Sequence, residues 1–445
     1  MSKILLIGAG KSATTLIDYL LNNAVNENWS VTVADMDLKL AEQKVNFHTK
    51  AKAIQLDVSN LDELEKHISA HDIVISMLPA FMHMDVARFC LKHKKHMATA
   101  SYVSDEMQEL DEEAKKAGII LLNEIGLDPG VDHMTAMQVL DRLRNKGCVI
   151  TGFETFTGGL MAPESENNPW KYKFTWNPRN VVMAASGGSV KFMQGGKYKY
   201  IPYHKVFRRT EVIDIEGFGE FEAYANRDSL KYIDLYNLEG VKTIYRGTLR
   251  RVGFSKAWDV FVQLGATDDT YEMENTTQLT HREFINSFLF YHPTDSVETK
   301  LAMLLKLDHD SDELRKITWL GFFKNELVGL TKPSTPAQVL QHILEKKWTL
   351  KSGEKDMIVM WHKIDYVENG TPHEINCTLA VKGDDDLNTA MAKTVGIPLG
   401  IAVKNIVTGK ITTPGVQIPN TKEIYQPVLK ELEEFGIKCN ERMIY

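Results

Sequence analysis

A glycine-rich turn near the start of the chain constrains its fold more than any other feature. Residues 4–13 read ILLIGAGKSA, an apolar run followed by two glycines, a lysine and two small residues. The first glycine permits a tight bend, the second lets the backbone approach a pyrophosphate, and the last small residue lets a helix pack closely on the strand. Amides at the helix start face phosphate oxygens. The residues expected at the cofactor are Gly8, Gly10, Lys11, Ser12 and Ala13.

Short apolar runs alternate with helical patterns through the first 125 residues, which is typical of a parallel sheet with crossover helices. The strand candidates are Ile4–Ile7, Val31–Ala34, Ala53–Leu56, Ile73–Leu78, Met97–Ala100 and Ile119–Leu122. One helical pattern, residues 104–117, opens with Ser104, a residue type that caps helix N-termini. Six strands with helices on both faces predict a doubly wound, dinucleotide-binding Rossmann domain.

Asp35 closes the second predicted strand, where sheets of this kind carry the acid that meets the adenosine ribose. A carboxylate there hydrogen-bonds the ribose hydroxyls and repels a 2′-phosphate. The next residues, Met36 and Asp37, supply no arginine. NAD is therefore favoured over NADP, with Lys39 or Lys11 as the residues that would accept a 2′-phosphate.

The ends of the third and fourth predicted strands supply further cofactor candidates, because ligands of open α/β sheets bind at the carboxyl ends of strands. Asp57 and Val58 are expected at the adenine edge. Ser76, Met77 and Leu78 end the fourth strand at the same edge of the sheet.

The rest of the chain reads as two further parts. From Val149 aromatic and β-branched runs are broken by glycine and proline, and helical periodicity follows from about Ser255. Strands then return around Asn369-Gly370, a hairpin turn signal. The predicted α/β organisation is a Rossmann domain at residues 1–129, completed by about 387–420, a middle α+β substrate domain at 130–254 and 355–386, and an inserted all-helical domain at 255–354.

Composition excludes several classes of protein. The 445 residues are 43% hydrophobic and 25% charged, a balance typical of soluble globular proteins. A net charge of −7 disfavours nucleic acid or an anionic membrane as a partner. The four cysteines are scattered and lack metal-ligand spacing, so we expect neither a zinc site nor a disulfide framework. No signal peptide or membrane span is apparent, and a cytoplasmic location is expected.

A second constellation follows the sixth predicted strand, where residues 123–134 read NEIGLDPGVDHM. A turn there would lie against the nicotinamide, so Leu127, Asp128, Pro129 and Gly130 are expected at the cofactor. Related segments are TASY at 99–102, GGLMAPE at 158–164, ANRDS at 225–229 and RGTLR at 246–250. Together these motifs make the chain similar to the saccharopine reductase family, the L-glutamate-forming saccharopine dehydrogenases, from Lys3 through the C-terminal helix.

This resemblance implies a reversible reaction of lysine metabolism, in which saccharopine, NAD or NADP, and water give L-glutamate and 2-aminoadipate 6-semialdehyde. The substrate-binding residues that it implies are Ser101, Tyr102, Asp128, Arg227, Thr248, Leu249 and Arg250, to which we add Arg246 as a further cation. Saccharopine carries three carboxylates, and guanidinium groups hold carboxylates through paired donors. The arginines are thus the local cations that an acidic chain needs for an anionic substrate. An exposed sheet in the middle domain would also suit a homodimer.

Imine chemistry needs a group that protonates nitrogen or activates water. Asp128 is the first candidate, Tyr102 the second and His133 the third. Two positions depart from the family pattern. Thr157 stands where a cysteine is expected, and Asp35 stands where NADP-using relatives have a neutral residue followed by arginine.

Two other functions stay open. An imine reductase similar to carboxynorspermidine dehydrogenase would need an acidic pocket in place of the arginines. A redox sensor would bind the dinucleotide without turnover, and the Asp128 turn would then have no purpose.

Overall fold

The computed structural model describes residues 1–186 and 188–444. The chain forms two compact units. Unit 1 comprises Met1–Ile150, Val367–Thr371 and Leu379–Glu441, and unit 2 comprises Thr151–Tyr366, Pro372–Thr378 and the residues from Arg442 onward. This division draws no boundary between a substrate part and a helical part of unit 2, so the three domains expected from the sequence stay a prediction.

The sheet of unit 1 has parallel strands in the order β15-β6-β5-β4-β1-β2-β3. The strands are β1 (Ser2–Ile7), β2 (Trp29–Asp35), β3 (Ala51–Gln55), β4 (Ile73–Ser76), β5 (His96–Ala98), β6 (Ile120–Leu122) and β15 (Gly415–Gln417). All six predicted strands are present. The chain order reverses between β1 and β4, which is the doubly wound arrangement, and the carboxyl ends of β1, β2 and β4 lie together at one edge.

One group of helices packs on a single face of this sheet. The helices are α3 (Leu61–Ser69), α4 (His83–His93), α5 (Asp105–Glu109) and α6 (Asp111–Ala117). Their apolar side chains share a buried cluster with Leu5, Ile7 and Val74 of the strands. Leu5 and Ile7 face the same side because side chains alternate along a strand. Ser104 caps α5 as predicted, and its hydroxyl accepts from the Met107 amide at 3.1 Å.

The other helices of unit 1 are α1 (Thr14–Asn23), α2 (Leu38–Val45), α7 (Val131–Asn145), α15 (Ala390–Val407) and α16 (Lys422–Leu432). Helix α15 packs on α1 and α16, and α16 packs on α7. Among the described residues, α15 is the one helix long and apolar enough to cross a membrane, yet 78% of it is buried inside the protein. Its apolar surface is thus used in packing.

Two glycines bring α15 close to α1. A Cβ at Gly396 would lie 2.8 Å from the Leu16 amide nitrogen, and one at Gly400 would lie 2.5 Å from the Tyr19 ring. The first neighbour is helix backbone, which cannot rotate away. The helix contact therefore depends on the missing side chain at position 396.

The second sheet is mixed and has the strand order β10-β11-β12-β7-β13-β14-β16, with β8 and β9 attached beside β12. The strands are β7 (Val149–Met161), β8 (Val190–Gln194), β9 (Lys197–Ile201), β10 (Thr210–Ile215), β11 (Gly219–Ala225), β12 (Thr243–Arg251), β13 (Asp356–Glu368), β14 (Thr371–Lys382) and β16 (Asn440–Ile444). Strand β12 runs parallel to β7 and antiparallel to β11. Asn369 and Gly370 both have positive φ and connect β13 to β14, as the hairpin signal predicts.

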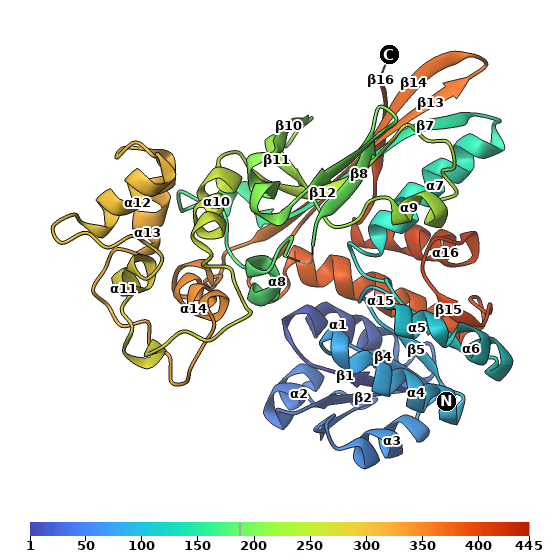
Figure 1. Ribbon diagram of the computed structural model, residues 1–445. Helices are drawn as coiled ribbons and strands as arrows, with labels where there is room; N and C mark the ends of the chain where they lie inside the picture. The colour runs from blue at the N-terminus through green and yellow to red at the C-terminus, as the bar shows by residue number, and fades with distance from the viewer. Residues whose placement is uncertain (187, 445) are drawn as a thin grey trace. The chain divides into compact units, whose positions relative to one another are not determined.

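Helices fill the long connection between β12 and β13 (Figure 1). They are α10 (Phe254–Leu264), α11 (His281–Asn286), α12 (Val297–Leu305), α13 (Asp312–Leu320) and α14 (Pro336–Trp348), while α8 (Pro178–Val182) and α9 (Lys231–Leu235) lie earlier in unit 2. Capping boxes begin α11, at Thr280 and Glu283, and α14, at Thr335 and Gln338. Such reciprocal caps satisfy backbone donors at helix starts. The mixed α/β class with a Rossmann sheet and a second sheet agrees with the sequence prediction.

The cysteines correct one expectation. Cys377 and Cys439 are disulfide-bonded, and Cys90 and Cys148 are free. Bonded cysteines so far apart in sequence leave no local spacing signal, which is why the sequence indicated only separate thiols.

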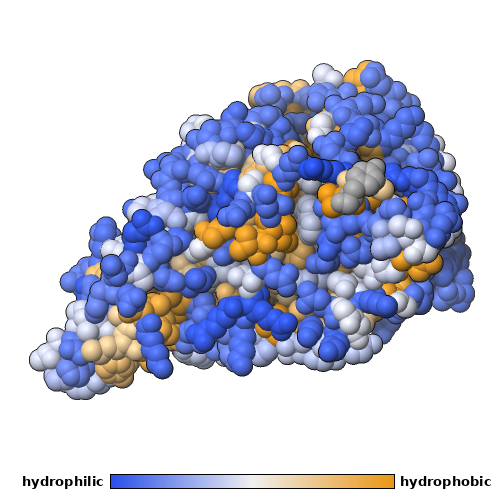
Figure 2. Space-filling model, turned by 90° about the horizontal axis from the view of Figure 1, so that it is seen from above, coloured by the Kyte–Doolittle hydropathy of each residue, from blue (hydrophilic) through white to orange (hydrophobic). Residues whose placement is uncertain are grey.

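The face of the protein in Figure 2 is mainly hydrophilic, with smaller apolar areas between the hydrophilic ones.

We expect Gly396→Ala to lower the stability of unit 1, because its Cβ would overlap the α1 backbone. Overpacking of this kind costs about 1–3 kcal/mol, against a helix-propensity gain of about 1 kcal/mol. The urea midpoint measured by circular dichroism would fall. An unchanged or higher midpoint would show that the helices can separate without loss.

Candidate dinucleotide and substrate sites

The two glycines of the first turn have different reasons to be glycine. Gly8 has φ +102°, and a Cβ there would lie 3.0 Å from the Met77 carbonyl oxygen. Gly10 has φ −63°, and a Cβ there would meet nothing within 4 Å. The fold thus requires Gly8, whereas the space above Gly10 is open at the start of the Lys11–Ala13 turn that leads into α1. An open cradle over backbone amides fits the pyrophosphate of a dinucleotide.

Asp35 lies at the end of β2 and is held against this turn. One carboxylate oxygen accepts from the Ala9 amide at 2.7 Å, and the other accepts from the Asp37 amide at 2.9 Å. Asp57 follows β3 and accepts from the amide and hydroxyl of Ser59, which lowers the pKa of Asp57. The sheet therefore places the predicted residues Gly8, Asp35 and Asp57, with Val58 beside the last, at one edge.

Residues after β4 join the same edge. The Met77 amide donates to the Ile7 carbonyl at 2.9 Å, which holds the β4 end beside the β1 end. Ser76 is fully buried, while Met77 and Leu78 are partly exposed.

The Asp128 turn between β6 and α7 is closed by its own backbone. The Gly126 amide donates to the Pro129 carbonyl at 3.0 Å, and a Cβ at Gly130 would lie 2.1 Å from the Gly126 carbonyl oxygen. Glycine at 130 is therefore needed for this turn. The turn leaves Asp128 partly exposed, and the Tyr102 hydroxyl donates to its carboxylate at 3.1 Å. The first two acid–base candidates thus form one hydrogen-bonded pair.

Buried Glu124 fixes the loop that carries Tyr102. One carboxylate oxygen accepts from the Val103 amide at 2.9 Å, and the other lies 2.7 Å from His133 Nε2. Glu124 and His133 are 4% and 0% exposed. His133, the third acid–base candidate, is thus held in a buried pair with Glu124. This position does not favour a role for His133 in acid–base catalysis. The sequence carries no signal for Glu124, because its role depends on contacts to the Val103 loop and to His133 in α7.

A second residue absent from the sequence prediction, His83, lies at the start of α4. Its Nδ1 lies 2.8 Å from the Ser76 hydroxyl and its Nε2 lies 2.7 Å from the Ser101 hydroxyl. Burial lowers the pKa of His83 to about 4. One neutral ring therefore connects a predicted cofactor residue with a predicted substrate residue. A lone histidine within a helical pattern carries no signal of such a contact.

In unit 2, β12 brings several predicted substrate residues onto one face. Arg246, Thr248 and Arg250 share that face because side chains alternate along a strand, whereas Leu249 points to the other side. The Arg246 guanidinium lies 3.8 Å from the centre of the Tyr232 ring. Arg227 lies after β11, is exposed and has φ +52°.

Arg250 is a buried cation that lacks an acidic partner among the described residues. It is 5% exposed, its guanidinium lies 5.0 Å from the Tyr172 ring centre, and Nη1 donates to the Leu249 carbonyl at 2.9 Å. Glu222 stands opposite Arg250 in the β11–β12 register. Its carboxylate instead accepts from the Gly253 and Ser255 amides at the start of α10. A buried guanidinium without a carboxylate partner is suited to bind an anionic ligand.

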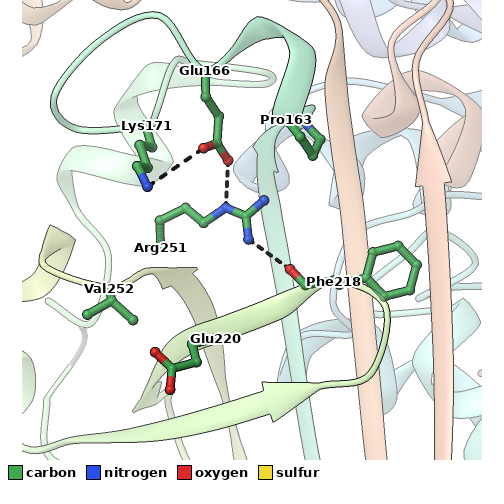
Figure 3. A pocket seen from close by; sticks show the side chains of 7 residues that line it. All are labelled: Pro163, Glu166, Lys171, Phe218, Glu220, Arg251 and Val252. Atoms are coloured by element: carbon green, nitrogen blue, oxygen red, sulfur yellow. Dashed lines mark hydrogen bonds and ion pairs between the residues drawn. The ribbon is translucent and has the colours of Figure 1, made fainter.

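The next residue, Arg251, faces the opposite side of β12 and a separate pocket of about 440 Å³ (Figure 3). Its Nε donates to the Glu166 carboxylate at 2.6 Å, and its Nη1 donates to the Phe218 carbonyl at 3.1 Å. This arginine is thus already paired. A second pocket, of about 610 Å³, lies at the amino ends of β1–β3 and includes Lys3, Lys52 and Lys66.

The fold and the glycine turn define unit 1 as the dinucleotide-binding part of a two-unit α/β protein. Two family models match the chain: the saccharopine dehydrogenase NADP binding domain over residues 4–122, and the saccharopine dehydrogenase C-terminal domain over residues 126–437. The chain belongs to the saccharopine dehydrogenase family. The family description gives NADP, and the expected preference for NAD finds no support in it.

Individual relatives span the whole chain. It is 35% identical to the saccharopine dehydrogenase (NADP(+), L-glutamate-forming) of Schizosaccharomyces pombe, covering 100% of this chain and 99% of that one. It is 33% identical to the alpha-aminoadipic semialdehyde synthase of Arabidopsis thaliana, covering 99% of this chain but 45% of that protein. The apo structure of the L-Glu-forming saccharopine dehydrogenase of Saccharomyces cerevisiae matches with a TM-score of 0.89 and 32% identity over both full chains.

We expect Gly10→Ala to weaken dinucleotide binding without loss of stability. Its Cβ would occupy ligand space but touch no protein atom, and a Gly→Ala change at an allowed φ stabilises by about 0.4–1 kcal/mol through the unfolded state. Calorimetric titration with NAD and NADP and a thermal melt would measure both effects. The matched control, Gly8→Ala, should lower the melting temperature instead. Unchanged affinity in Gly10→Ala would show that the cofactor does not approach this turn.

Proposed function

We propose that the chain is an L-glutamate-forming saccharopine dehydrogenase that oxidises the secondary amine of saccharopine and hydrolyses the resulting imine. The observation that carries this proposal is Arg250, a buried guanidinium that shares one face of β12 with Arg246 and Thr248 and has no acidic partner among the described residues. Saccharopine offers three carboxylates to such cations. The names of full-length relatives support the same activity.

The proposed reaction transfers one hydride to the cofactor, consumes one water and releases one proton. Bound at the glycine turn of unit 1, the nicotinamide dinucleotide would accept the hydride. Saccharopine loses that hydride from carbon and a proton from nitrogen, which leaves a carbon–nitrogen double bond. Water then adds to the carbon, and the carbon–nitrogen bond breaks to release L-glutamate and 2-aminoadipate 6-semialdehyde.

Asp128 and Tyr102 are the proposed acid–base residues. Asp128 is partly exposed at the carboxyl end of the sheet and holds the Tyr102 hydroxyl at 3.1 Å. The carboxylate would take a proton from water as it adds, and the hydroxyl would keep the carboxylate in place. Glu124 would act through the loop by holding Val103.

We propose NAD as the preferred cofactor on the strength of Asp35. Its carboxylate is held at the glycine turn by the Ala9 and Asp37 amides, where it would accept from ribose hydroxyls and repel a 2′-phosphate. The relatives' names weigh toward NADP. A cytoplasmic location, a homodimer and the absence of a membrane partner stay predictions.

The cofactor assignment predicts a higher kcat/KM with NAD than with NADP at saturating saccharopine. Asp35→Ser should reduce this preference by about tenfold, because removal of one nearby negative charge relieves repulsion worth about 1 kcal/mol or more. The ratio of kcat/KM with NAD to kcat/KM with NADP is measured from initial rates, followed by the absorbance of the reduced nicotinamide. A higher kcat/KM with NADP in the unaltered protein would refute the assignment.

The substrate assignment predicts that Arg250→Lys raises the KM for saccharopine by about tenfold or more, because lysine keeps the charge but loses the paired donors. The control is Arg251→Lys, which changes the neighbouring arginine on the opposite face and should leave KM nearly unchanged. Steady-state kinetics measure both variants. Protein that binds the dinucleotide but gives no saccharopine-dependent reduction would refute the proposed enzyme and favour a sensor, while turnover of a carboxylated polyamine would favour the other imine reductase.

A further inference from the structure

The His83 ring contacts both a predicted cofactor residue and a predicted substrate residue of unit 1. Ser76 ends β4, Ser101 follows β5, and the His83 ring bridges their hydroxyls at 2.8 and 2.7 Å. The ring is 4% exposed and Ser76 is 0% exposed, whereas Ser101 is partly exposed. The ring thus connects the core to a hydroxyl that a ligand can reach.

The protonation state of the ring follows from its surroundings. Burial lowers the pKa of His83 to about 4, so the imidazole is neutral at physiological pH. A neutral imidazole donates from one nitrogen and accepts at the other. If Nε2 carries the proton, Ser76 donates to Nδ1 and Ser101 accepts from Nε2. If Nδ1 carries the proton, Ser76 accepts from the ring and Ser101 donates to it.

The needs of buried Ser76 decide between these arrangements. With the proton on Nε2, Ser76 donates to Nδ1 and its only donor is used. With the proton on Nδ1, Ser76 would accept from the ring, and its own hydrogen would have no other acceptor among the described residues, which is costly in a buried site. Thr99 lies farther away, 3.4 Å from Nε2, and does not alter this comparison. The proton therefore belongs on Nε2.

We propose that His83 is a positioning residue that fixes Ser101 as a hydrogen-bond donor to a carboxylate of the substrate. Ser101 accepts from Nε2, so its own hydrogen is left for an external acceptor. A carboxylate only accepts, and an ammonium only donates, so this arrangement favours the former. The inference rests on the proposed function and assigns a carboxylate of the substrate as the acceptor of the Ser101 hydroxyl.

The kinetic test compares His83→Leu with His83→Gln in the full-length protein. Leucine removes both ring contacts and should raise the KM for saccharopine by about tenfold, with a smaller change in the KM for NAD. Glutamine carries an acceptor and a donor on one carbon and should restore most of the loss. In a Ser101→Ala background, His83→Leu should have little further effect on KM, because the hydroxyl it positions is gone.

His71→Leu is the matched control. His71 is another buried histidine of unit 1, bonded to the Thr32 hydroxyl at 2.9 Å and the His67 carbonyl at 2.6 Å. Both His71 and Thr32 line the pocket at the amino ends of β1–β3, whereas Asp35 ends β2 at its carboxyl end. His71→Leu should lower stability without changing the KM for saccharopine. An equal rise in KM in His71→Leu, or a normal KM in His83→Leu, would overturn the proposal.

The proton position can be measured without any variant. Long-range ¹H–¹⁵N spectra of histidine-labelled protein should show His83 with its proton on Nε2, with the signal assigned by its loss in His83→Gln. A proton on Nδ1 would overturn the proposal even if His83→Leu does not fold. Absence of saccharopine turnover in the unaltered protein would refute the proposed function and leave this hydrogen-bond assignment testable on its own.

Discussion

The parallel pairing of β1 with β2 on one side and β4 on the other is the constraint on which unit 1 depends. It gathers three strand ends at one edge and sends the following turns in opposite directions, which opens the crevice where such sheets bind ligands. The turns come so close that a Cβ at Gly8 would lie 3.0 Å from the Met77 carbonyl oxygen. Asp35 then closes the turn through the Ala9 amide. The cofactor cradle is therefore a consequence of strand order.

Buried polar contacts hold the surrounding loops in place. Glu124 connects the Val103 amide to His133, and His83 connects Ser76 to Ser101. Isolated polar groups in the core would be destabilising, but each of these has its partner within 3 Å. They convert loops between strands into rigid supports for the partly exposed side chains that face a ligand.

In unit 2 a competition between donors leaves a cation available. Glu222 is the nearest acid to Arg250 by strand register, yet its carboxylate binds the amides at the start of α10. A helix N-terminus stabilises negative charge through its unpaired amides and its dipole. The Arg250 guanidinium lies over the Tyr172 and Phe254 rings, and it forms an ion pair with no acidic residue among those described. The same strand directs Arg251 to the other face, where Glu166 pairs with it.

The sequence by itself determined the features that rest on local chemistry: the glycine turn, the strands recognised by apolar runs, the cap at Ser104, the Asn369-Gly370 hairpin and the family motifs. Those signals lie within a few residues of one another, and their physics is the same in any context. Only the tertiary structure decided that the three-residue strand β15 joins the first sheet, that His83 meets Ser101 and that Glu222 leaves Arg250 unpaired. Each of these depends on contacts between residues that are distant in sequence, and such contacts are decided only when the fold brings the residues together.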